Sequence, residues 1–161
     1  MNRVQPENVH TTIFTPREYQ VELVDACLRG NVLSVLASRS TRTFLITMVT
    51  RELAHHTRST DHGGKDLRTL ILGWSGPSLV RAGEAIQQNT NLAVTTYTTL
   101  DQVDKWVPSR WSQAFREAQV LIMTVDVLER GLGDGVLPFD MLNLLVVTDA
   151  HRMPSSPSVV E

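Results

Sequence analysis

The sequence predicts an α/β fold in which a parallel sheet carries helices on both faces. Short runs of aliphatic and β-branched residues recur along the chain, and segments of helical length separate them. The runs are apolar throughout, without polar residues at alternate positions, which is typical of strands buried on both faces of a parallel sheet. The chain has 161 residues, so it has room for one domain of this kind.

The first element is predicted to be a helix that begins at Pro16. Thr15 is a suitable N-cap, proline is favoured at the first helical position, and Glu18 is placed to close a capping box. Apolar residues then follow at helical spacing, and Gly30 is well placed to end the helix.

The segment after this helix predicts the first strand, Val32–Leu36, which ends near Ala37. A turn at Ser38–Arg42 then leads into a second helix, Thr43–His55. The following residues, Thr57–Asp66, include two adjacent glycines and predict an exposed loop.

The rest of the chain repeats the same alternation. The remaining predicted strands are Thr69–Leu72, Leu92–Thr96, Val120–Met123 and Leu144–Val147. The remaining predicted helices are Pro77–Gln88, Arg110–Glu117 and Val125–Arg130, the last of them ended by Gly131, Gly133 and Gly135. Five short strands separated by helices imply βαβ crossovers and a parallel sheet.

The ends of the chain lack these patterns. Residues 1–12 show no periodicity and are expected to be flexible, and residues 153–161 are rich in proline and serine and are expected to form a flexible tail. The domain is therefore placed at residues 13–152.

The composition indicates the cellular compartment in which the protein works. Cys27 is the single cysteine, so the chain cannot form an internal disulfide, and no secretory signal pattern is present. The apolar runs are far shorter than the about 20 residues that span a bilayer. We therefore expect a cytoplasmic protein with no membrane association. The net charge of -2 neither supplies nor excludes a basic face for RNA.

The segment Phe14–Leu23 resembles the opening of the helicase portion of Dicer, the ribonuclease that cuts double-stranded RNA in silencing pathways. The resemblance continues at Arg51–Ala54, Arg110–Phe115 and Val120–Thr124, so it covers nearly the whole chain. The chain is identified on this basis as an amino-terminal, RecA-like DExD/H helicase lobe of a Dicer. Its pattern is similar to the degenerate lobe of arthropod Dicers of the microRNA branch.

The resemblance also implies roles for individual residues. Tyr19 and Gln20 would belong to the Q motif that reads adenine. Ser75 with Gly76, and Thr124, would belong to two motifs at strand ends that face RNA. The resemblance further implies a second RecA-like lobe, ribonuclease III segments and other Dicer domains, which this chain does not contain.

The segment Ala37–Thr43 occupies the place of the phosphate-binding loop, G-x-x-x-x-G-K-S/T. In that loop, glycines let backbone N–H groups approach the phosphates, the lysine meets the β and γ phosphates, and the hydroxyl binds Mg²⁺. This chain keeps Ser40, Arg42 and Thr43 but has no glycine there. Thr41 is β-branched and would be strained wherever the loop needs a positive φ. An arginine does not freely replace the lysine.

The segment Thr148–His151 resembles the acidic Asp-Glu-Cys-His box of the family. In one alignment Thr148 replaces the Mg²⁺-binding Asp and Asp149 stands for the catalytic Glu. In the other, Asp149 is the metal residue and Ala150 removes the base. Neither alignment supplies both carboxylates, so Asp149 and His151 are remnants of a catalytic site, and hydrolysis should be lost.

The loss of the loop glycines and the loss of one carboxylate together predict a pseudo-ATPase lobe that needs no cofactor. We expect it to recognise double-stranded or precursor-microRNA and to dock a double-stranded RNA-binding partner protein and the remaining Dicer domains. The alternative is an enzyme lobe that binds ATP with Mg²⁺ through Gln20, Arg42 and Thr43 and hydrolyses it when joined to its second lobe. A regulatory decoy for Dicer partners is a third interpretation.

The RecA-like fold that this chain resembles has another strand between the Val32–Leu36 strand and the Leu144–Val147 strand. In this chain no such strand follows the acidic box. We therefore expect a truncated lobe of marginal stability.

Several other side chains have a functional and a structural interpretation. Arg39 and Arg42 could hold an RNA phosphate, but exposed arginines in turns are usually solvated, and no role is assigned on charge alone. The histidines at positions 55, 56 and 62 have no cysteine nearby, so no metal site is predicted. The tryptophans at positions 74, 106 and 111 are expected to pack in the core or on a partner, with base stacking as the less favoured role.

Overall fold

Four parallel strands form the sheet at the centre of the computed structural model, in the order β2-β3-β1-β4. The structure describes residues 16–54, 67–135 and 139–152. The strands are β1 (Arg68–Gly73), β2 (Val94–Tyr97), β3 (Val120–Thr124) and β4 (Leu142–Val147). This arrangement confirms the predicted α/β class with a parallel sheet.

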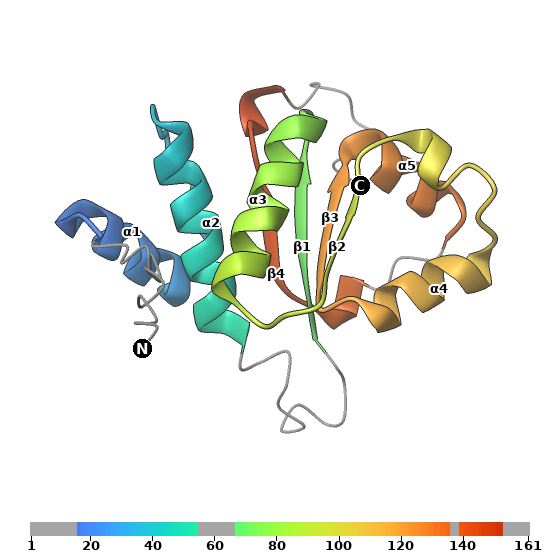
Figure 1. Cartoon of the computed structure of the whole chain (residues 1–161), viewed down its shortest axis with the longest axis horizontal. Coiled ribbons are helices and arrows are strands. Elements are labelled where there is room, and N and C mark those ends of the chain that lie inside the picture. Colours follow the sequence, from blue (N-terminus) through green and yellow to red (C-terminus); the bar gives the residue numbers. More distant parts are fainter. Residues whose placement is uncertain (1–15, 55–66, 136–138, 153–161) are drawn as a thin grey trace, which may run out of the picture.

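Helices cover both faces of the sheet, as predicted (Figure 1). On one side lie α1 (Glu18–Arg29), α2 (Arg39–Leu53) and α3 (Gly76–Asn89). On the other side lie α4 (Pro108–Glu117) and α5 (Val125–Gly133). In the described residues no helix is long and apolar enough to cross a membrane.

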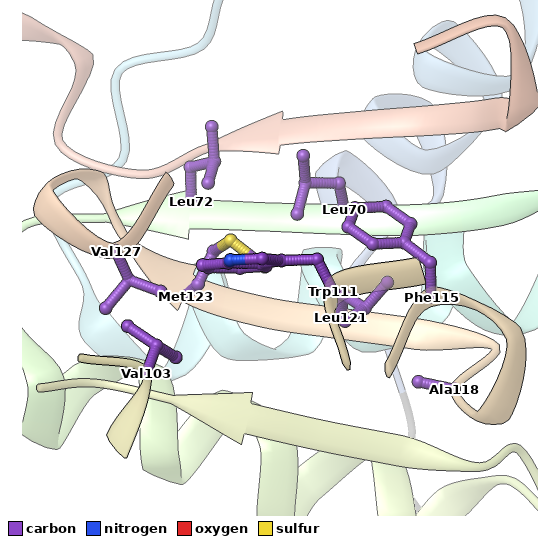
Figure 2. Close-up of a cluster of buried hydrophobic side chains, with 9 residues drawn as sticks. All are labelled: Leu70, Leu72, Val103, Trp111, Phe115, Ala118, Leu121, Met123 and Val127. Carbon is purple, nitrogen blue, oxygen red and sulfur yellow. The ribbon is translucent and has the colours of Figure 1, made fainter. Parts of the chain in front are cut away.

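The two central strands, β1 and β3, are buried at every position, which explains their continuous apolar runs. Successive side chains point to opposite faces of a strand. Leu70 and Leu121 therefore pack under α4 and α5, while Ile71 and Ile122 pack under α3. Figure 2 shows the first of these clusters, with Trp111 of α4 at its centre.

The tryptophan prediction is confirmed for two of the three residues. Trp111 is 1% exposed, and its indole N–H donates to Asp134 at 3.2 Å. Trp106 packs edge-on against both Trp111 and Tyr97, with ring centroids 4.8 and 4.9 Å apart. Trp74 is half-buried.

The predicted first strand is wrong. The run Val32–Leu36 forms no strand, and the side chains of Leu33 and Val35 are 89% and 99% exposed. A strand needs a neighbour that accepts its backbone hydrogen bonds, and β4 is the last strand on this side of the sheet. Only Leu36 of the run packs against the cluster between α1 and α2, which Leu144 of β4 also contacts.

The start of the first helix is also corrected. The helix α1 begins at Glu18, two residues after Pro16, with Arg17 as its N-cap. The side chain of Gln20, not that of Glu18, accepts a hydrogen bond from the backbone N–H of Arg17 at 2.9 Å. Thr15, the predicted cap, lies outside the described residues.

Two further helix boundaries differ from prediction. The helix α2 begins at Arg39, where a turn was predicted, because Ser38 caps it by accepting from the backbone N–H of Thr41 at 3.5 Å. The helix α5 continues through Gly131, whose Cβ position would lie only 3.1 Å from the ring of Trp111. The other predicted elements that fall within described residues are present, with ends that shift by up to two residues.

Candidate functional site

The carboxyl ends of the parallel strands meet at one edge of the sheet, here called the carboxyl edge. In the register of β1 with β3, Gly73 lies opposite Thr124, and in that of β1 with β4, Leu72 lies opposite Val147. Open parallel sheets bind ligands in the crevice outside this edge. The residues that follow these strand ends include Ser75, Gly76, Thr148 and Asp149.

The phosphate-loop remnant, defined as Ala37–Thr43, is largely helical. Among the described residues, only Asp149 and Gly135 have a φ in the left-handed region, so no residue of this remnant adopts the conformation that glycines of a phosphate loop would normally supply. Thr41 is 6% exposed inside α2 and is not strained. The hydroxyls of Ser38 and Ser40 bond to each other at 2.7 Å. The phosphate-loop remnant therefore forms the first turn of α2, with Ser38 as its N-cap.

The predicted adenine-reading residues contact this remnant directly. The hydroxyls of Tyr19 and Thr41 are hydrogen-bonded at 3.1 Å, and the amide of Gln20 donates to the Thr41 hydroxyl at 3.5 Å. The amide oxygen of Gln20 is occupied by the backbone N–H of Arg17. Both ends of the Gln20 amide therefore have partners within the chain.

The cation of the phosphate-loop remnant pairs with the acid at the end of β4. Nη1 of Arg42 donates to Oδ1 of Asp149 at 2.9 Å, and their side chains are 30% and 18% exposed. The φ of Asp149 is 53°, a conformation that Asp tolerates better than most residues. This ion pair joins the two remnants that the sequence predicted separately.

The other residues of the acidic-box remnant, Thr148–His151, are placed as follows. The Thr148 hydroxyl donates to the carbonyl oxygen of Leu72 at 3.1 Å. His151 lies in a short 3₁₀ turn, Ala150–Arg152, and is exposed. Asp149 is the single carboxylate of the remnant, so either alignment of the box leaves one carboxylate.

The residues predicted to face RNA lie together at the ends of β1 and β3. Ser75 is the N-cap of α3, and its side chain makes no capping hydrogen bond. The Cβ position of Gly76 would lie 3.3 Å from Thr98, so this backbone packs closely. Thr124 is 4% exposed, and its hydroxyl has no hydrogen-bond partner among the described residues.

Two cavities adjoin the remnants, and their sizes and charges differ. The larger, about 500 Å³, is lined by Tyr19, Leu23, Thr41 and the Val32–Ser38 segment, and no charged residue lines it. The smaller, about 30 Å³, lies between α2 and α3 and is lined partly by Arg39, Arg42 and Arg81. The cavity that is large enough for a small molecule therefore has no charged lining, and the cavity that is lined by arginines is small.

Sequence reasoning missed Ser78 and Arg81, which line the smaller cavity from α3. Their spacing of three residues puts them on one face of a helix, but the sequence does not show that this face meets α2. The histidines at positions 55, 56 and 62, for which no metal site was predicted, lie outside the described residues.

No family model matches the chain. Curated relatives do match. Endoribonuclease Dicer of Gallus gallus is 35% identical over 147 residues, which is 91% of this chain. The chain belongs to the Dicer family. It spans 8% of the length of that Dicer relative, and 10% of Endoribonuclease Dicer homolog 2b of Oryza sativa subsp. japonica, which is 27% identical over 84% of this chain.

A solved structure supports the fold of this Dicer homologue. A nuclease-deletion mutant of the Type ISP restriction-modification enzyme LlaGI, in complex with a DNA substrate mimic, matches with a TM-score of 0.54 at 17% identity. The match covers 84% of this chain and 15% of that chain. At this identity the match shows the fold alone, and it agrees with the RecA-like lobe predicted for a Dicer helicase region.

Proposed function

We propose that this Dicer-type helicase lobe works without ATP and helps its parent protein to bind double-stranded or precursor-microRNA. The proposal that the lobe works without ATP rests on the ion pair between Arg42 and Asp149 at 2.9 Å. In an ATPase, the cation at this position binds phosphate and the acidic box holds Mg²⁺ or the attacking water. Here the two groups neutralise each other.

The cavities support the same proposal. A cavity of about 30 Å³ holds about two water molecules, so the arginine-lined space is too small for a nucleoside triphosphate. The cavity of about 500 Å³ has the volume of a small-molecule site, but no cation lines it to offset the charge of a triphosphate. Neither cavity combines the room and the charge that ATP requires.

RNA binding is supported by family membership and by the carboxyl edge. Ser75, Gly76 and Thr124 line up across two neighbouring strand ends, where open parallel sheets bind ligands. The hydroxyl of Thr124 is buried and has no partner in the described part of the chain, so a ligand would reach it only after a local rearrangement of this edge. Serine and threonine hydroxyls and backbone N–H groups commonly contact nucleic-acid phosphates.

The Dicer relatives support a proposal for the wider role. A lobe that binds RNA without hydrolysis would help an endoribonuclease III to select its substrate, while other domains of the parent protein cut it. We propose that a double-stranded RNA-binding protein and the remaining Dicer domains are its partners, and that it acts in the cytoplasm.

The test is nucleotide-induced stabilisation. The melting temperature of the chain is measured with and without millimolar ATP and Mg²⁺, beside a restored variant carrying Arg39→Gly, Thr41→Gly and Arg42→Lys. A ligand at 100 times its dissociation constant adds about 2.7 kcal/mol to the stability of the folded state. We expect no shift for the native chain and a shift for the restored variant.

The matched control carries the same two glycines with Arg42→Gln, which supplies the loop without its cation. It should not respond to ATP. Equal stabilisation of the native chain and the restored variant would contradict the proposal that the lobe works without ATP. It would favour the alternative of a lobe that binds and hydrolyses ATP. Binding of a labelled double-stranded RNA, measured with and without ATP, then tests the second half of the proposal: the affinity should be the same in both conditions.

A further inference from the structure

The smaller cavity is lined by arginines from two different helices. Arg39 and Arg42 come from the first turn of α2, and Arg81 comes from α3. The hydroxyl-bearing residues Thr43 and Ser78 line it from the same two helices. Guanidinium and hydroxyl groups around a small space form a donor set for an oxyanion.

The positive charge at this cavity is mostly uncompensated. None of its lining residues is a carboxylate. Asp149 pairs with Arg42, while Arg39 and Arg81 are exposed and form no ion pair within residues 16–54, 67–135 and 139–152. About two positive charges therefore converge on this space without a protein counter-ion.

The position at the start of α2 adds to this field. A helix N-terminus carries a partial positive charge, so acidic residues are favoured in its first turn. The first turn of α2 contains no acidic residue and instead contains Arg39 and Arg42. Arg42 is paired with Asp149, whereas the charge of Arg39 at this position opposes the helix dipole, and a bound anion would offset it.

We propose that this cavity binds one phosphate group of an RNA backbone, through the guanidinium groups of Arg39 and Arg81 and the hydroxyl of Ser78. The inference rests on the RNA-binding half of the proposed function. The cavity volume of about 30 Å³ excludes a triphosphate. Planar guanidinium groups recognise phosphate oxygens in pairs, which fixes the orientation of the group as well as its charge.

The place of the cavity favours RNA as the source of that phosphate. Ser78 lies one helical turn, about 5 Å along the axis, from Ser75 at the start of α3. Thr148, at the end of β4, also lines the cavity. The cavity therefore opens beside the carboxyl edge where Ser75 and Thr124 lie, and a backbone that crosses this edge reaches it.

The first arm of the test uses inorganic phosphate. Its binding to the 161-residue chain is followed by calorimetry for the native chain, Arg39→Gln, Arg81→Gln and Arg116→Gln. Arg116 is an exposed arginine of α4, on the opposite face of the sheet, so its substitution changes the net charge equally. Loss of one charged contact should weaken phosphate binding about tenfold in the first two variants. The Arg116→Gln chain should bind as the native chain does.

The second arm uses a fluorescent double-stranded RNA at several salt concentrations. Removing one phosphate contact should lower the slope of log affinity against log salt by about 1 for Arg39→Gln and Arg81→Gln. The slope for Arg116→Gln should not change. Melting curves of all variants confirm that each remains folded.

The outcomes separate the two proposals. RNA binding that is equally strong in Arg81→Gln and Arg116→Gln overturns the cavity as the phosphate site and leaves the proposed RNA function standing. Phosphate binding that depends on Arg81, without any RNA binding, overturns the RNA source and the proposed function together. Dependence of both ligands on Arg39 and Arg81 supports the inference.

Discussion

Nη1 of Arg42 donates to Oδ1 of Asp149 at 2.9 Å, across 107 positions of sequence. The pair connects the first turn of α2 to the residue that follows the end of β4 by two positions. The pair joins the phosphate-loop remnant to the acidic-box remnant, and it links the start of α2 to the end of the outer strand of the sheet.

This ion pair should contribute measurably to stability because both side chains are partly buried. Arg42→Met and Asp149→Asn, alone and together, form a double-mutant cycle, and we expect a coupling energy of about 1 kcal/mol from urea unfolding. Asparagine tolerates the positive φ at position 149, so this substitution removes charge without backbone strain. Additive effects of the two substitutions would mean that the pair contributes nothing.

Gly131 should resist substitution even though alanine is the better helix former. A Cβ at this position would lie 3.1 Å from a ring carbon of Trp111, which is 1% exposed, so the buried ring would have to shift by a few tenths of an ångström. Gly131→Ala should therefore cost about 1 to 3 kcal/mol of unfolding free energy.

Gly133→Ala is the control for this prediction. It lies in the same helix with nothing within 4 Å of its Cβ position, and it should be neutral or slightly stabilising. Thermal unfolding distinguishes the two, and a neutral Gly131→Ala would contradict the contact with Trp111.

The buried hydroxyl of Thr124 should affect ligand binding more than folding. Because it has no partner among the described residues, Thr124→Val should leave stability unchanged or raise it by about 1 kcal/mol. The same substitution should weaken RNA binding if the hydroxyl meets the ligand.

Thr50→Val is the matched variant, since the Thr50 hydroxyl is also buried without a described partner but lies in α2, away from the carboxyl edge. Fluorescence anisotropy with labelled RNA compares them. Equal RNA affinities for both variants would remove Thr124 from the proposed interface.

The exposed run at Leu33 and Val35 should promote self-association. These side chains are 89% and 99% exposed, so replacing them with Ser and Thr should leave the melting temperature nearly unchanged and reduce aggregation measured by light scattering. Leu36→Ser should behave differently, because Leu36 packs against the cluster between α1 and α2. It should lower the melting temperature, and a result in which all three positions behave alike would contradict this division.

The sequence by itself determined the α/β class and the buried strands. The apolar runs at β1 and β3 could be identified because both faces of those strands are covered, so every position is selected for burial. The absence of loop glycines and of a second carboxylate was likewise visible in the sequence, since it depends on residue identity alone.

The tertiary structure alone decided which of these residues meet. The Val32–Leu36 run has strand composition, yet it is not a strand, because pairing depends on a neighbour that sequence pattern does not specify. The contacts of Arg42 with Asp149, and of α2 with the Arg81 face of α3, likewise depend on how helices pack on the sheet. Local pattern reports burial and propensity, whereas ion pairs and cavities arise between segments that are distant in sequence and are brought together only by packing.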